Sequence, residues 1–155
     1  MCSSDLPDVE MVAAVGRPDA HAGEIPVAYV KLRVGADATA DALKAYARAH
    51  VRERAAAPDW VEPMALMPTT AVGKIFKPAL RRRAIERAVL ELLAAEGIEA
   101  SVTAHDDARH GTVADVVLVD GTRQARAQAL CGALALHTRL ATAGPVDADP
   151  ARLSQ

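Results

Sequence analysis

The sequence PTTAVGKIFKPALR at residues 68–81 joins a loop of small residues to the start of a basic helix. Gly73 can adopt backbone angles that other residues rarely reach, so the chain can turn sharply just before Lys74. Pro78 suits the first turn of a helix, where its missing N–H costs nothing. The stretch therefore predicts a tight loop that presents one lysine, followed directly by a helix.

Two apolar segments before this loop have the pattern of β-strands. Val9 to Val15 is mostly apolar. Ile25 to Val34 is also mostly apolar, and from Val30 onward its apolar and basic side chains alternate, which is typical of a half-buried strand. Gly16-Arg17-Pro18-Asp19 and Gly23 predict a loop between the two segments. Because the connection is short, we expect an antiparallel pair.

The segment between the second strand and the loop predicts a helix and a short strand. Thr39 is placed as a helix N-cap, and Asp41 puts a negative charge in the first turn. The helix should stop before Pro58. Residues 60–67 then predict an edge strand that Pro63 interrupts.

The helix after Pro78 has an apolar stripe and is expected to end at Gly97 as its C-cap. The stripe is formed by Leu80, Ile85, Ala88, Val89, Leu92 and Leu93. Beyond Gly97, residues 100–104 and 112–119 predict two strands, and Thr122 is placed as the cap of a helix that runs to about His137. The sequence shows no internal repeat.

The expected fold class is α+β: a small sheet with an antiparallel hairpin flanked by helices, plus a C-terminal β-hairpin–helix extension. We place a domain at residues 1–97, a small α/β extension at 98–142, and a disordered tail at 143–155, which is rich in Gly, Pro and Asp. The long helix is shared between the first two parts.

Composition excludes several classes of protein. The net charge of −2 gives the whole chain no strong attraction to nucleic acid or anionic membranes. No apolar run approaches the roughly 20 residues that span a bilayer, and the first residues have no signal-peptide pattern. Cys2 and Cys131 lack metal-ligand spacing, so we expect a reduced cytoplasmic protein without a metal site.

Basic residues concentrate around the lysine loop. From Lys74 to Arg87 there are six basic residues and a single acidic one, Glu86. This excess is typical of a surface that meets anions, although the segment is not a phosphate-binding P-loop, because Ile75 follows the lysine. The simpler interpretation of Lys77, Arg81, Arg82, Arg83 and Arg87 is a solvated helix face.

Residues 68–81 resemble the terminal motif of the superfamily of acyl-CoA synthetases, peptide-synthetase adenylation domains and luciferases, roughly Pro-x-Thr-x-x-Gly-Lys-x-x-x-x-x-Leu-Arg. Val15 to Asp19 together with Gly23 to Val30 is similar to the strand–loop–strand opening of the small C-terminal domain in that family. The two motifs occur in the family's order with a helix between them. The resemblance covers about residues 7–88.

The resemblance implies that Lys74 is the adenylation lysine of an ATP-dependent acyl-CoA synthetase. Gly73, Thr69 and Thr70 would support its loop. Lys77, Arg81 and Arg82 would be candidate contacts to CoA or to the large domain. ATP, Mg²⁺ and CoA are implied for the intact enzyme, and none is expected to be bound by this chain alone.

The large N-terminal domain of the family, with its acyl pocket and Mg²⁺ site, is absent from this sequence. We therefore expect a fragment that is inactive by itself and whose partner is that domain, in cis or in trans. Three alternatives stay open: a non-catalytic module that acts in trans, part of an enzyme that loads a carrier protein, and a basic module that uses residues 77–87 to bind nucleotides. His105, Asp106, Asp107 and His110 are interpreted as a polar turn rather than a metal site.

Overall fold

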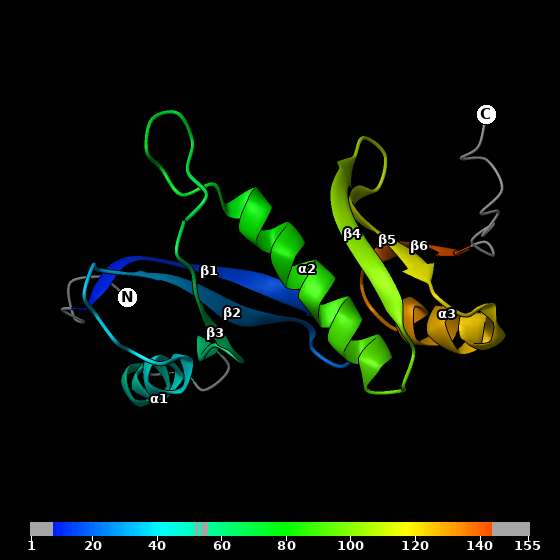
Figure 1. Cartoon of the computed structure of the whole chain (residues 1–155), viewed down its shortest axis with the longest axis horizontal. Helices are drawn as coiled ribbons and strands as arrows, with labels where there is room; N and C mark the ends of the chain where they lie inside the picture. Colours follow the sequence, from blue (N-terminus) through cyan, green and yellow to red (C-terminus); the bar gives the residue numbers. More distant parts are fainter. Residues whose placement is uncertain (1–7, 52, 54–55, 144–155) are drawn as a thin grey trace, which may run out of the picture.

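The computed structural model describes residues 8–51, 53 and 56–143. These residues form two three-stranded sheets. The long helix α2 (Lys77–Ala94) lies between the sheets (Figure 1). No helix among the described residues is long and apolar enough to cross a membrane.

The first sheet has the strand order β1 (Val9–Asp19), β2 (Gly23–Leu32), β3 (Val61–Pro63). The antiparallel pairing of β1 with β2 is confirmed, and β3 runs parallel to β2. The loop predicted from Gly16 is wrong, because Gly16 pairs with Pro26 and the ladder continues to Asp19. The Asp19 carboxylate accepts hydrogen bonds from the backbone N–H groups of residues 21 and 22, which confines the turn to three residues.

Helix α1 (Ala40–His50) begins as predicted, because the Thr39 hydroxyl accepts a hydrogen bond from the Ala42 N–H at 3.2 Å. The helix covers one face of the first sheet, where Leu43 packs with Val30 and Val61. β3 is shorter than the predicted strand over residues 60–67. After Pro63 only the Met64 N–H reaches the β2 backbone, at Val30 O.

Helix α2 packs into two hydrophobic cores. It does so through two rows of apolar side chains whose positions in the sequence are offset by one residue. Leu80 and Ala84 pack against the first sheet with Tyr29 and Trp60. Ile85, Val89 and Leu93 pack against the second sheet. The helix ends two residues before the predicted cap, with Ala95 as its C-cap. Gly97 closes the turn that follows: it has a φ of +67°, and the Ile98 N–H bonds to the Leu93 carbonyl at 3.0 Å, a pattern that left-handed glycine permits.

The second sheet has the strand order β4 (Ala100–Asp107), β5 (Gly111–Leu118), β6 (His137–Thr142). The predicted β4–β5 hairpin is confirmed. However, residues 105–107 belong to β4 rather than to the turn, because they pair with residues 111–113.

The predicted helix from Thr122 to His137 is wrong at both ends. Asp120 caps a short 3₁₀ turn, and the helix that follows, α3, spans only Gln124–Gly132. His137 begins β6, which pairs in parallel with β5. Pairing with β5 satisfies backbone groups that would otherwise lie unpaired at the edge of the sheet.

Both sheets are built in the same order: a β-hairpin, a crossover helix, and a third strand parallel to the second. A parallel strand needs such a crossover connection, because a tight turn can join only antiparallel neighbours. The α+β class is therefore confirmed, and the extension gains a strand that the sequence did not predict. The predicted disordered tail lies outside the described residues apart from Ala143, and the domain boundary near residue 97 stays a prediction.

Candidate functional site

Residues 68–76 form a small hairpin in the segment between β3 and α2, and this segment projects from the body of the protein (Figure 1). Thr69 pairs with Ile75 in an isolated bridge. Three backbone bonds close the hairpin: Phe76 N to Pro68 O at 2.8 Å, Thr70 N to Lys74 O at 2.7 Å, and Gly73 N to Thr70 O at 2.9 Å. The lysine therefore follows a defined turn.

Two of the predicted support residues act directly on this turn. Gly73 has a φ of +79°, a conformation in which any Cβ is disfavoured. The Thr70 hydroxyl accepts a hydrogen bond from the Lys74 backbone N–H at 3.2 Å. Both features define the backbone path at Lys74.

We expect Gly73→Ala to loosen the hairpin by about 1–2 kcal/mol, because a non-glycine residue pays that cost in the left-handed region. A Cβ at Gly73 would meet no atom within 4 Å, so backbone strain is the whole effect. Amide exchange of residues 70–76 measures it by NMR. Gly23→Ala is the matched control, since Gly23 has a φ of +75° and equally open surroundings. Exchange that rises in the hairpin of both variants would contradict a local effect.

The Lys74 side chain is exposed and forms no ion pair or side-chain hydrogen bond with any residue the structure describes. Large apolar side chains are exposed in the same segment: Leu66 and Val72 at 80% each and Phe76 at 39%. Exposed apolar groups around a cation are typical of a surface that contacts a partner.

The arginines of α2, in contrast, meet carboxylates of the chain itself. Arg81 pairs with Glu24 of β2, and Arg82 pairs with Asp106 of β4 at 2.8 Å. These two pairs tie the helix to different sheets, so the structure does not bring Arg81 and Arg82 together as one site. Lys77 forms no such pair within the described ranges.

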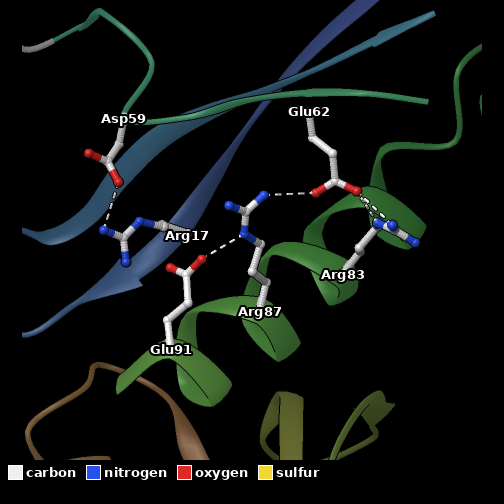
Figure 2. A network of polar contacts seen from close by, with 6 residues as sticks. All are labelled: Arg17, Asp59, Glu62, Arg83, Arg87 and Glu91. Atoms are coloured by element: carbon white, nitrogen blue, oxygen red, sulfur yellow. Dashed lines mark hydrogen bonds and ion pairs between the residues drawn. The ribbon is translucent and has the colours of Figure 1, made fainter. Parts of the chain in front are cut away.

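A further network of ion pairs, which sequence reasoning missed, joins α2 to β3, and β1 to the residue Asp59 just before β3 (Figure 2). Glu62 pairs with Arg83 at 2.6 Å and with Arg87 at 3.1 Å. Arg87 also bonds Glu91 at 2.8 Å, and Arg17 bonds Asp59 at 2.8 Å. The only signal in the sequence was an acidic residue in a short apolar strand, and that did not reveal its partners.

Trp60 lies at the centre of this network and is 7% exposed, as expected of a core anchor. The guanidinium carbons of Arg17 and Arg87 lie 5.0 and 4.3 Å from its ring centroid, a geometry that stabilises cations. Burial, and after it the nearby Glu62 carboxylate, raises the pKa of Tyr29 to about 12. Tyr29 therefore stays protonated and neutral inside the first core.

No group of three metal-ligating side chains occurs among the residues that the structure describes. Asp107 accepts hydrogen bonds from the backbone N–H groups of Arg109 and His110 and from the Arg139 side chain, and these bonds lower its pKa. Asp106 is engaged by Arg82. Cys131 is a buried thiol whose pKa is raised by burial, and Cys2 lies outside the described residues.

Residues 3–74 match the model of the AMP-binding enzyme C-terminal domain, with Lys74 as the last matched residue. A marinolic acid–CoA ligase from Pseudoalteromonas sp. (strain SANK 73390) is 44% identical over 111 residues, which cover 70% of this chain and 17% of that protein. An acetyl-coenzyme A synthetase from Deinococcus radiodurans is 41% identical over 78 residues, 50% of this chain and 12% of that protein. An acyl-CoA synthetase structure from Brucella canis is 31% identical with a TM-score of 0.48, covering 54% of this chain and 16% of that one.

The chain thus spans less than a fifth of the length of the curated relatives it matches. The match to the marinolic acid–CoA ligase covers 70% of this chain, whereas residues 1–97 make up a smaller share. Wherever the match begins, it must therefore include residues beyond 97. That relative therefore shares sequence with part of the second sheet. The first half of this chain is a C-terminal domain of the AMP-forming ligase superfamily.

Proposed function

We propose that this chain supplies the adenylation lysine, Lys74, to an ATP-dependent acyl-CoA synthetase. The observation that carries the proposal is the exposed lysine on a closed hairpin, next to arginines that are already paired. Lys74 and Lys77 have no carboxylate partner among the described residues, and Lys74 is the one that the hairpin itself presents.

The proposed reaction has two steps. A carboxylate oxygen attacks the α-phosphorus of ATP, forming an acyl-adenylate and releasing pyrophosphate. The thiol of CoA then attacks the acyl carbon, forming the thioester and releasing AMP. Carboxylate and phosphate repel each other as they approach, and a positioned ammonium offsets this repulsion in the transition state. The Lys74 side chain provides that ammonium.

The partner in this proposal is the large adenylate-forming domain, joined in cis or supplied in trans. It would bind the acid and ATP. It would also bind Mg²⁺, for which the described residues offer no cluster of three metal-ligating side chains. The exposed Leu66 and Val72 beside the hairpin would be covered by that domain. The isolated chain is then expected to be inactive, and a reaction using ATP and CoA is expected in the cytoplasm.

Among the candidate contacts to CoA or the large domain, Lys77 fits best, because it has no carboxylate partner within the described ranges. Arg81 and Arg82 would have to exchange Glu24 and Asp106 for a phosphate. Exposed pairs of this kind contribute little stability, so such an exchange is energetically accessible.

The test is a chimera in which this chain replaces the matched C-terminal part of the D. radiodurans acetyl-coenzyme A synthetase. We expect acid-dependent release of pyrophosphate and AMP that requires Lys74. CoA and a carrier protein are offered separately as thiol acceptors. Activity that is unchanged by Lys74→Ala would refute the proposed role, and so would an inactive chimera when the relative's own C-terminal part restores activity.

A further inference from the structure

Glu62 connects the two ends of the segment that carries Lys74. It lies in β3, just before the chain leaves the first sheet, and its partners Arg83 and Arg87 lie one turn apart on α2, just after the chain returns. Residues 64–76, including the hairpin, run between these two attachment points. Figure 2 shows the Glu62 carboxylate reaching both arginines.

The contact uses both oxygens of the carboxylate. Oε1 accepts a hydrogen bond from Arg83 Nε at 2.8 Å, and Oε2 accepts one from Arg87 Nη1 at 3.1 Å. The Glu62 side chain is 17% exposed, so water screens these bonds less than it screens an ordinary surface pair. Ion pairs that form a network with good geometry contribute more to stability than isolated exposed pairs.

Arg87 is itself held in place from two other sides. Its Nε donates to Glu91 Oε1 at 2.8 Å, and its guanidinium lies over the Trp60 ring. Trp60 and Glu62 flank Val61, so both point to the α2 side of the strand, whereas Val61 packs in the α1 core. Arg87 is therefore held by Glu91 and Trp60 in addition to Glu62.

β3 is a short strand. It shares the register pairs Ala28–Val61, Tyr29–Glu62 and Val30–Pro63 with β2, and beyond them the Met64 N–H bonds to Val30 O at 2.7 Å. Met67 is buried at 4% exposure and anchors the middle of the segment in the first core. Met67 is thus a hydrophobic anchor within the segment, whereas the ion pairs of Glu62 connect its two ends.

We propose that Glu62 is a positioning residue that fixes the base of the Lys74 hairpin by clamping β3 to α2. Its relevance to catalysis rests on the function proposed for Lys74, whereas the clamp itself is a property of this chain. Without the carboxylate, the hairpin keeps its internal bonds but its base gains freedom relative to α2. A cation that stabilises a transition state must be placed precisely, so this added freedom would reduce its effect even though its charge is unchanged.

The first test is amide hydrogen exchange of the 155-residue chain with Glu62→Gln, which keeps the shape of the side chain and removes its charge. We expect about tenfold faster exchange at residues 64–76, as for a lost bond to a charged group, and unchanged exchange in β4 and β5. Glu91→Gln is the matched control, because it removes the other partner of Arg87 without touching β3. Exchange in residues 64–76 that is unchanged by Glu62→Gln, raised equally by Glu91→Gln, or raised uniformly over the chain would overturn the clamp.

The second test separates positioning from simple stability in the chimera described above. Glu62→Gln is expected to slow adenylate formation by about tenfold and to leave thioester formation from a preformed adenylate unchanged. A merely structural role would slow both steps alike, and that result would overturn the proposal. An inactive chimera with the unsubstituted chain refutes the role of Lys74 instead, while the exchange experiment still decides the clamp.

Discussion

Replacing Lys74 with alanine is expected to slow acyl-adenylate formation by about 100- to 1,000-fold, the usual cost of removing one group that stabilises transition-state charge. Because the side chain is exposed and has no partner among the described residues, its removal should leave the fold unchanged. The measurement is single-turnover pyrophosphate release in the chimera with saturating acid and ATP. Equal denaturant midpoints for both proteins establish that folding is intact.

The second half-reaction provides the discriminating control. Starting from preformed acyl-adenylate, Lys74→Ala should slow thioester formation much less, because the two negative groups have already been joined. Lys44→Ala is the matched lysine variant, because Lys44 lies in α1, outside the segment that carries Lys74, and it should leave adenylation close to normal. An equal loss in both half-reactions, or an equal loss with Lys44→Ala, would count against Lys74 as the adenylation lysine.

Ending the chain after residue 97 is expected to abolish cooperative folding. Ile85, Val89 and Leu93 are 4%, 0% and 0% exposed in the complete chain, and they pack against the second sheet and α3. Exposing these side chains to water would lower the free energy of unfolding by roughly 1.5–3 kcal/mol for each side chain. Domains are typically stable by only about 5–15 kcal/mol. Urea unfolding followed by circular dichroism should therefore show no cooperative transition.

A point variant tests, without truncation, whether the packing of α2 against the second sheet is needed for stability. Val89→Asp places a charge in the second core, whereas Leu90→Asp places it at a neighbouring position of α2 that is 38% exposed. Only the first should lower the unfolding free energy strongly, by about 3 kcal/mol or more. A truncated chain that unfolds at the midpoint of the complete chain would show instead that the first sheet is stable by itself.

Local signals in the sequence predicted most elements but misplaced several of their ends. Thr39 marked a helix start correctly and Gly97 marked a helix end to within two residues, because caps depend on a few neighbouring residues. Gly16 and Pro18 suggested a loop, yet both lie in β1, whose edge position tolerates a proline. β6 was not predicted because its partner strand, β5, is separated from it in the sequence by α3, and local patterns do not reveal pairing between distant segments.

By itself, the sequence determined the turn that presents Lys74, because Gly73 and the small residues before it specify a backbone path within a few positions. The tertiary structure alone decided which cations remain available. Arg81, Arg82 and Arg83 look equivalent to the lysine in a list of basic residues, but each meets a carboxylate at least 21 positions away. An ion pair depends on the distance between side chains, and folding sets that distance for residues that the sequence keeps apart.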